Sequence, residues 1–302
     1  LNNPNQPLPA NLQSQLNAVS NRQSIQQIAQ SYNQFVQENR ANAGATESMQ
    51  SMANREAQQK FINGIGNAAT SERILLAAYS PNQLEEVMTD FWYNHFNVYR
   101  NKTAHSRIFF QDYEKNAIRP YALGKFKDLL TATAHHPAML SYLDNWLSST
   151  PRQMTRDGKT TTVGGINENY AREIMELHTL GVNGGYSQAD VTALARILSG
   201  WSYTLENIAA GKQFTYKRAA HDSTAKTWLG QNFPAGQQQE EGERALDILA
   251  RSPATAKHVA TELAIYFVSD NPPASLVSKL QSTFLQSNGD IKQVLKVLFN
   301  ST

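Results

Sequence analysis

One short stretch, NENYAREIMELHTLGV over residues 167–182, concentrates side chains capable of acid–base chemistry. Glu168, Arg172 and Glu176 recur every four residues, so in a helix they share one face and Arg172 can bridge both carboxylates. A carboxylate beside a guanidinium at a helix start suits general acid or base catalysis. The same ladder is also typical of a structural ion network, and both interpretations stay open.

A second carboxylate for acid–base catalysis must come from another part of the chain. Glu176 lies about 12 Å along the helix axis from Glu168, beyond the roughly 5–9.5 Å typical of glycosidase pairs. Asp144 ends the preceding predicted helix, so we expect it to be the partner of Glu168. The neighbouring polar side chains that we expect to bind substrate are Asn145, Asn167 and Arg172.

Aromatic rings and histidines form a second group of candidates. In DFWYNHFNVY, residues 90–99, Trp92 and His95 share one apolar helical face. His95 is either a core histidine bonded to a backbone carbonyl or part of a pocket wall, where Trp92 suits a sugar ring. We expect Trp201 and His221 along the same cleft, although the His-Asp pair of HDSTAKTWLG is also typical of an ordinary turn.

The sequence carries no signature of a bound metal. It contains no Cys, which excludes disulfides and thiolate sites. The segment EIMELH differs from HExxH, and Glu173 and His178 fall on different helix faces, so they do not form a zinc pair. We therefore expect no metal and no cofactor, and we expect His178 to be a core residue.

Composition excludes two classes of partner. The 302 residues are 40% hydrophobic and 17% charged with a net charge of +2, which is typical of a soluble globular protein. Lys and Arg are scattered, so we expect no nucleic-acid binding. No apolar run approaches the roughly 20 residues that span a bilayer, so we expect no membrane insertion. The chain starts at Leu1 and stops within a predicted helix, so we expect further residues at both ends.

Apolar residues at helical spacing predict an all-α fold, a single multi-helix domain with at most a small β-hairpin. The hairpin is expected to pair Trp201–Thr204 with residues 212–218, and residues 147–166 are expected to form a loop. Helix starts are predicted at Ser80 and Ser187 from their capping residues. A helix around residues 52–62 is expected to end at Gly64 and Gly66, after a polar break at residues 41–48.

Four blocks in fixed order resemble a bacterial family of unknown function, DUF1800: DFWYNHFNVY, HHPAMLSYLDN, NENYAREIMELHTLGVNGGYSQADVTALARILSGW and HDSTAKTWLG. The resemblance runs from about Ser71 to the end. We therefore expect residues 1–70 to form an N-terminal, partly extended and helical segment, and residues 71–302 to form a helical family core truncated at its C-terminus. The resemblance implies a secreted or periplasmic bacterial protein and brings no activity.

Three functions from different classes fit these observations. The first is a secreted hydrolase acting on a polysaccharide or other glycan, with Glu168 as acid and Asp144 as its partner. The second is a non-enzymatic cell-surface or assembly module, and the third is a metal-dependent helical-bundle enzyme. We favour the first, with a glycan or other small polar substrate bound in a cleft bordered by Glu168, Arg172 and His95.

Overall fold

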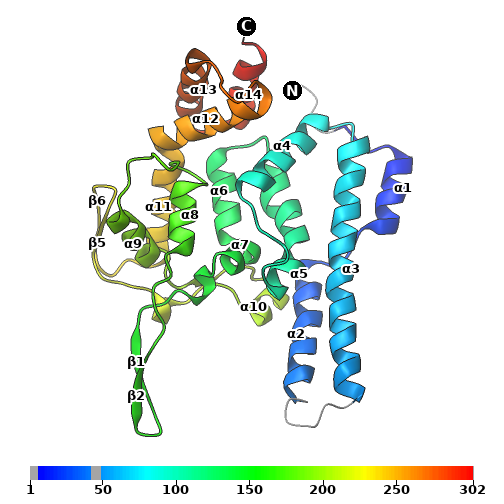
Figure 1. Cartoon of the computed structure of the whole chain (residues 1–302), viewed down its shortest axis with the longest axis vertical. Helices are drawn as coiled ribbons and strands as arrows, with labels where there is room; N and C mark the ends of the chain where they lie inside the picture. The colour runs from blue at the N-terminus through cyan, green and yellow to red at the C-terminus, as the bar shows by residue number, and fades with distance from the viewer. Residues whose placement is uncertain (1–5, 42–48, 302) are drawn as a thin grey trace.

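The computed structural model describes residues 6–41 and 49–301, and helices dominate it (Figure 1). The predicted all-α fold class is confirmed. The α-helices are α1 (Ala10–Val19), α2 (Ile25–Ala41), α3 (Met49–Tyr79), α4 (Gln83–His95), α5 (Ala104–Asp112), α6 (Phe126–His135), α7 (Pro137–Tyr142), α8 (Asn169–Glu176), α9 (Gln188–Ile197), α10 (Leu205–Ala209), α11 (Gln239–Arg251), α12 (Pro253–Phe267), α13 (Ala274–Gln286) and α14 (Ile291–Phe299). The shorter turns are the π-helix η1 (Tyr113–Ile118) and the 3-10 turns η2 (Arg119–Tyr121), η3 (Asn145–Leu147) and η4 (Arg218–Ala220).

Helix α3 runs without a break through Gly64 and Gly66, so the predicted helix end at these glycines is wrong. A glycine costs roughly 1 kcal/mol in a helix, but it keeps its backbone hydrogen bonds. Packing offsets that cost, because α1, α2, α4 and α5 all contact α3 and bury its Ile62 and Ile65. The polar break expected before α3 falls almost wholly outside the described residues.

The N-terminal segment is more helical than expected. Helix α1 follows Pro9 and buries Leu12 and Leu16, which are spaced one turn apart on the face toward α3. Residue 70, the expected boundary of the family core, lies inside α3. The N-terminal helices and the rest of the chain are therefore joined by one continuous helix (Figure 1).

Two predicted helix starts differ in outcome. At Ser187 the capping box with Asp190 is confirmed in both directions, and α9 begins at the next residue. At Ser80 the prediction is two residues early, because Asn82 is the cap residue of α4. The Gln83 amide donates to the Ser80 carbonyl at 2.7 Å, so the predicted pair of residues still interacts.

In the described part of the chain, strands form three antiparallel hairpins rather than one. The expected hairpin is confirmed as β3 (Trp201–Ser202) with β4 (Thr215–Tyr216). A second pairs β5 (Lys226–Trp228) with β6 (Gln231–Phe233). The third, β1 (Arg152–Arg156) with β2 (Lys159–Val163), replaces part of the loop expected at residues 147–166 and projects from the body (Figure 1). Its Asp157-Gly158 turn has positive φ at both residues, a strong hairpin signal.

One continuous apolar core joins residues from α2 through α14. Its largest fully buried side chains include Trp92, Trp201 and Trp228. Within residues 6–41 and 49–301, no helix is both long and apolar enough to cross a bilayer.

Candidate functional site

Glu168 occupies the N-cap position of α8, and hydrogen bonds hold its carboxylate. One oxygen accepts from Thr192 at 2.7 Å, and the other accepts from Gln188 at 2.8 Å and from Arg172 at 3.3 Å. The bonds from Thr192 and Gln188 are the main causes of a lowered pKa for Glu168. This group is therefore kept ionised, which suits a base or an anchor better than the expected acid.

The expected Arg172 bridge extends to one carboxylate only. Among the described ion pairs, Arg172 contacts Glu168, and its other partner is the side-chain oxygen of Gln188 at 2.9 Å. Burial raises the pKa of Glu173, and the nearby carboxylate of Glu176 raises it further. Hydrogen bonds from Arg172 and to Glu168 therefore connect the polar face of α8 to Gln188 of α9.

Asp144 lies in a turn between α7 and η3 with a left-handed backbone, φ +58°. Its carboxylate is paired with Lys102 at 3.1 Å, and the side chain is about one-third exposed. Asp is one of the few residues that adopt this conformation readily. Asp144 is paired with Lys102 and Glu168 with Arg172, and the catalytic pairing of the two carboxylates stays a prediction.

Trp92 and His95 belong to the core side of α4. Trp92 is fully buried, and its indole N–H donates to the Ala122 carbonyl at 2.9 Å. His95 Nε2 donates to the His178 carbonyl at 3.0 Å, and burial lowers the pKa of His95 to about 4. His178 and His258 lie against His95, with ring centroids 6.3 Å and 5.8 Å away. The core interpretation of His178 is thus supported by its 4% exposure.

Asn145, Trp201 and Asn167 meet around one structural junction. The buried Asn145 amide donates to the carbonyls of Leu198 and Trp201 at 3.1 and 3.0 Å. The backbone N–H of Asn167 donates to the hydroxyl of Ser148, three residues after Asn145. Trp201 is 0% exposed, so a substrate contact by its ring would require the core to open. These substrate-binding roles stay predictions.

His221 lies in a buried ionic cluster that ties the β5–β6 hairpin to α11. Its Nδ1 donates to the Ser199 carbonyl at 2.9 Å, and its Nε2 lies 3.6 Å from a Glu241 oxygen. The same Glu241 oxygen accepts from Lys226 at 2.7 Å, and both of these side chains are fully buried. Breaking a buried pair of this kind is strongly destabilising, which favours a structural role. Substrate binding by His221 stays a prediction.

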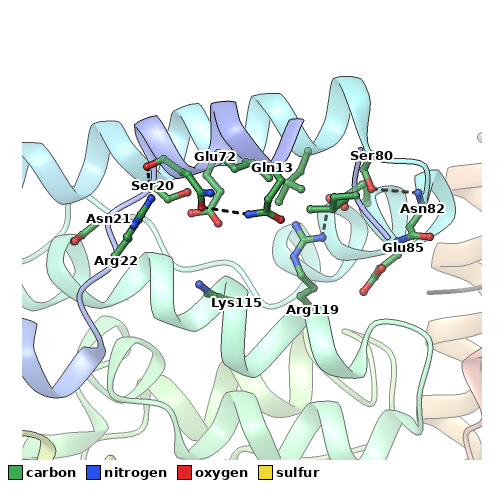
Figure 2. Close-up of a pocket in the computed structure, with 15 residues that line it drawn as sticks. Gln13, Ser20, Asn21, Arg22, Glu72, Ser80, Asn82, Glu85, Lys115 and Arg119 are labelled. Atoms are coloured by element: carbon green, nitrogen blue, oxygen red, sulfur yellow. Dashed lines mark hydrogen bonds and ion pairs between the residues drawn. The ribbon is translucent and has the colours of Figure 1, made fainter. Parts of the chain in front are cut away.

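A cavity of about 520 Å³ lies between α1, α3, α4 and the η1–η2 turns, away from these predicted residues (Figure 2). This volume is in the range of small-ligand sites. Its lining includes no aromatic ring and is rich in polar side chains. Those side chains are the carboxylates of Glu72, Glu85 and Glu86, the cations of Arg22, Lys115 and Arg119, and the amides of Gln13, Asn17, Asn21 and Asn82.

The two adjacent carboxylates of this cavity have different environments. Glu86 is buried and paired with Arg119 at 2.8 Å, and Arg119 also contacts Glu114 at 3.1 Å. Burial raises the pKa of Glu85 although Arg119 opposes the shift, and the charge of Glu86 adds to it. Figure 2 shows Arg119 and Lys115 directed toward the side chains of α1 and α3 across the cavity. The cavity therefore combines one carboxyl whose pKa is raised by burial with a neighbouring carboxylate that is paired with a guanidinium.

The residues that line this cavity were not expected from the sequence. Glu85 and Glu86 fall in the first turn of α4, where carboxylates are common because of the helix dipole. Arg119 is 33 residues away in the chain, and nothing in the sequence links it to Glu86. The raised pKa of Glu85 depends on burial, which the tertiary structure supplies.

Metal ligation has no visible basis in the part of the chain that the structure describes. No group of three or more His, Asp or Glu side chains is placed there to hold an ion. Two of the three contacting histidines bond a backbone carbonyl through a ring nitrogen. His95 bonds the carbonyl of His178, and His258 bonds the carbonyl of Leu177.

The structure is that of an all-helical protein with a cavity lined by polar and ionisable side chains. The chain belongs to the family described as "Protein of unknown function (DUF1800)", whose model matches residues 4–302. The match includes the N-terminal helices, which the resemblance noted in the sequence did not reach. No curated protein and no solved structure matches the chain.

Proposed function

We propose that this protein is a hydrolase that acts on a glycan or another small hydroxyl-rich substrate bound in the cavity beside α1, α3 and α4. The observation that carries the proposal is that burial raises the pKa of Glu85 in a cavity that a second carboxylate, Glu72, also lines. A carboxyl group with a raised pKa suits the acid role, and a second carboxylate in the same cavity can serve as the base.

In the proposed reaction, Glu85 is the proton donor. Its proton passes to the leaving oxygen as the bond to that oxygen breaks, and a water molecule adds at the other side. Glu72 is the candidate base that takes a proton from this water, since its carboxylate also lines the cavity and accepts a hydrogen bond from Gln111 at 2.9 Å. The Glu86–Arg119 pair holds fixed charges beside the reacting groups.

Substrate recognition would depend on hydrogen bonds and not on aromatic stacking. The carboxamides of Asn17 and Asn21 line the cavity with both donor and acceptor groups, as hydroxyl groups require, whereas the Asn82 carboxamide bonds the backbone of Gln6 at both ends. Arg22 donates to the Asn17 carbonyl at 3.0 Å, and Gln13 donates to the Asn17 side chain. We place this activity outside the cytoplasm, secreted or periplasmic, as the family resemblance implies.

A non-enzymatic binding module is the second candidate. The specific observation that favours it is that Glu86, the carboxylate next to Glu85, is already paired with Arg119 at 2.8 Å, so the cavity offers bound charges and amides more readily than a free acid–base pair. Under this alternative, the cavity would bind the same polar ligands without turnover.

The proposal is tested by sugar release from a panel of polysaccharides and by direct binding of their oligosaccharides. Glu85→Gln should reduce turnover about 100-fold or more, the usual scale of an acid–base role, and should retain binding. Turnover of the wild type should fall as pH rises through the raised pKa of Glu85, since the acid must be protonated.

The control is Glu206→Gln, which changes an exposed carboxylate on α10 and should leave turnover unchanged. Binding without turnover in the wild type would favour the binding module. Turnover that survives Glu85→Gln at the wild-type rate would show that the acid has been assigned to the wrong residue.

A further inference from the structure

A second cavity of about 410 Å³ lies on another side of α3, between α3, α5 and the loop that joins α4 to α5. Helix α3 contributes Ile62, Asn63, Gly66 and Asn67, which are spaced as one helical face. Arg107 and Phe110 come from α5, and Arg100 and Asn101 come from the loop. The volume is many times the roughly 30 Å³ that one water occupies in the liquid, so a small ligand fits.

The charges of this cavity have one sign only. Arg100 and Arg107 line it, and no carboxylate does. Across the described part of the chain, neither guanidinium has an Asp or Glu within ion-pair distance, whereas Arg73, Arg119 and Arg196 all do. Two cations that share a cavity without a counter-charge repel each other, so a bound anion would relieve an unfavourable interaction.

Arg107 also has unused hydrogen-bonding capacity inside the protein. Its Nε is buried and has no hydrogen-bond partner within residues 6–41 and 49–301. A buried polar nitrogen that makes no hydrogen bond costs roughly 1–3 kcal/mol, and more when charged. Native proteins leave few such groups, and a bound water or ion is one explanation of an unmade bond of this kind.

The remaining lining can hold a planar or tetrahedral oxyanion in place. Arg100 donates to the hydroxyl of Thr70 at 3.1 Å and lies over the Phe110 ring, which fixes its position. The side-chain amides of Asn63, Asn67 and Asn101 also line the cavity and add N–H donors. A Cβ at Gly66 would lie 3.7 Å from the Arg100 guanidinium, which is ordinary contact, so a larger side chain at this position would extend into the cavity.

We propose that this cavity is a binding site for a small oxyanion, a phosphate, sulfate or carboxylate group, held between Arg100 and Arg107. Guanidinium groups match such groups because their N–H donors form paired bonds to two oxygens. The site is separate from the cavity with Glu85, and the two proposals do not depend on each other.

Calorimetric titration with sodium phosphate, sodium sulfate and sodium citrate at constant ionic strength tests the proposal. At least one of these anions should bind the wild type saturably with one site per chain. Arg100→Gln should weaken that binding roughly ten- to hundredfold, the range expected for hydrogen bonds to a charged group. Gly66→Leu should abolish it by filling the cavity while leaving every charge in place. Arg100 is exposed in a loop, so its variant is expected to fold even if Gly66→Leu does not.

The matched control is Arg156→Gln, which removes the same charge from the exposed tip of the β1–β2 hairpin and should bind like the wild type. Failure of all three anions to bind would overturn the proposal. Equal weakening by Arg156→Gln would overturn it too, because the effect would then be one of net charge. Unchanged binding in Arg100→Gln would have the same consequence. Anion binding should persist in Glu85→Gln, so loss of the hydrolase proposal would leave this one standing.

Discussion

At the level of single residues, the local environment decides which carboxylate can carry a proton. Glu168 accepts three hydrogen bonds and is held ionised, whereas Glu85 is held by burial in a state closer to protonation. The two residues looked alike in the sequence, each in the first turn of a helix. We therefore assign the role of catalytic acid to Glu85, in place of Glu168, which the sequence suggested.

The roles of Glu168 and Glu176 can be separated by paired variants. We expect Glu168→Gln to lower stability by roughly 0.2–1 kcal/mol, since its bonds to Thr192, Gln188 and Arg172 are partly exposed. Glu176→Gln should change stability less, because its ion pair with Arg172 is not formed. Melting temperature and hydrolase activity are measured for both. Loss of activity in Glu168→Gln alone, at an unchanged melting temperature, would return the acid–base role to α8.

Acid should destabilise the protein through its buried histidines. Burial lowers the pKa of His178 to about 3, below its ordinary value of about 6.5. Between these two pH values His178 binds a proton in the unfolded chain but stays neutral in the folded chain. The stabilisation is complete above pH 6.5 and is lost as pH falls toward 3. We expect His178→Leu to flatten the fall in urea midpoint between pH 7 and pH 4.5. Parallel pH profiles of variant and wild type would contradict this assignment.

At the level of elements, the distance between two packed segments decides whether a glycine can be replaced by a larger residue. In α11, a Cβ at Gly242 would overlap the indole ring of Trp201, so this glycine lets β3 and α11 pack in contact. In α3, a Cβ at Gly64 would meet nothing within 4 Å. Two helical glycines thus have opposite structural meanings.

Alanine substitutions at these two glycines should have opposite signs. Gly242→Ala should lower the free energy of unfolding by roughly 1–3 kcal/mol, the usual cost of overpacking. Gly64→Ala should raise it by roughly 0.5–1 kcal/mol, because alanine favours the helix and meets no neighbour. Chemical denaturation of both variants measures the difference. A loss of stability in Gly64→Ala would mean that α3 is interrupted there, as the sequence suggested.

At the level of the whole molecule, the helices form one connected core to which the β1–β2 hairpin contributes little. Its two strands are exposed along nearly their whole length. At the base of the hairpin, the Ser149 N–H donates a hydrogen bond to the Gly165 carbonyl at 3.0 Å. Most of the free energy of folding comes from burial of apolar surface, which this hairpin does not add.

Replacing residues 152–163 by two glycines should therefore leave the fold intact. The ends of the removed segment are paired, Arg152 opposite Val163, so a short connection spans them. We expect the melting temperature to change by no more than a few degrees and both cavities to keep their ligands. A large loss of stability or of ligand binding, measured by thermal melting and calorimetry, would show that the hairpin contacts more than its own strands.

The sequence by itself determined the helical class of this protein and several local details. Apolar residues at helical spacing predicted most of the helices. The Ser187–Asp190 capping box and the β3–β4 hairpin were predicted because both depend on residues close together in the chain. The Arg172–Glu168 pair was predicted for the same reason. The family was recognised from four local blocks, and the family model matches residues 4–302.

Only the tertiary structure decided where the polar groups face. Trp92 and Trp201 are core residues, although an aromatic stripe in the sequence equally predicts a pocket wall. The Glu86–Arg119 pair joins residues 33 apart, and the cavity with Glu85 needs α1, which the sequence assigned to a separate segment. Helical periodicity reports which residues share a face, but burial, and with it the pKa of a carboxyl, depends on which distant element covers that face.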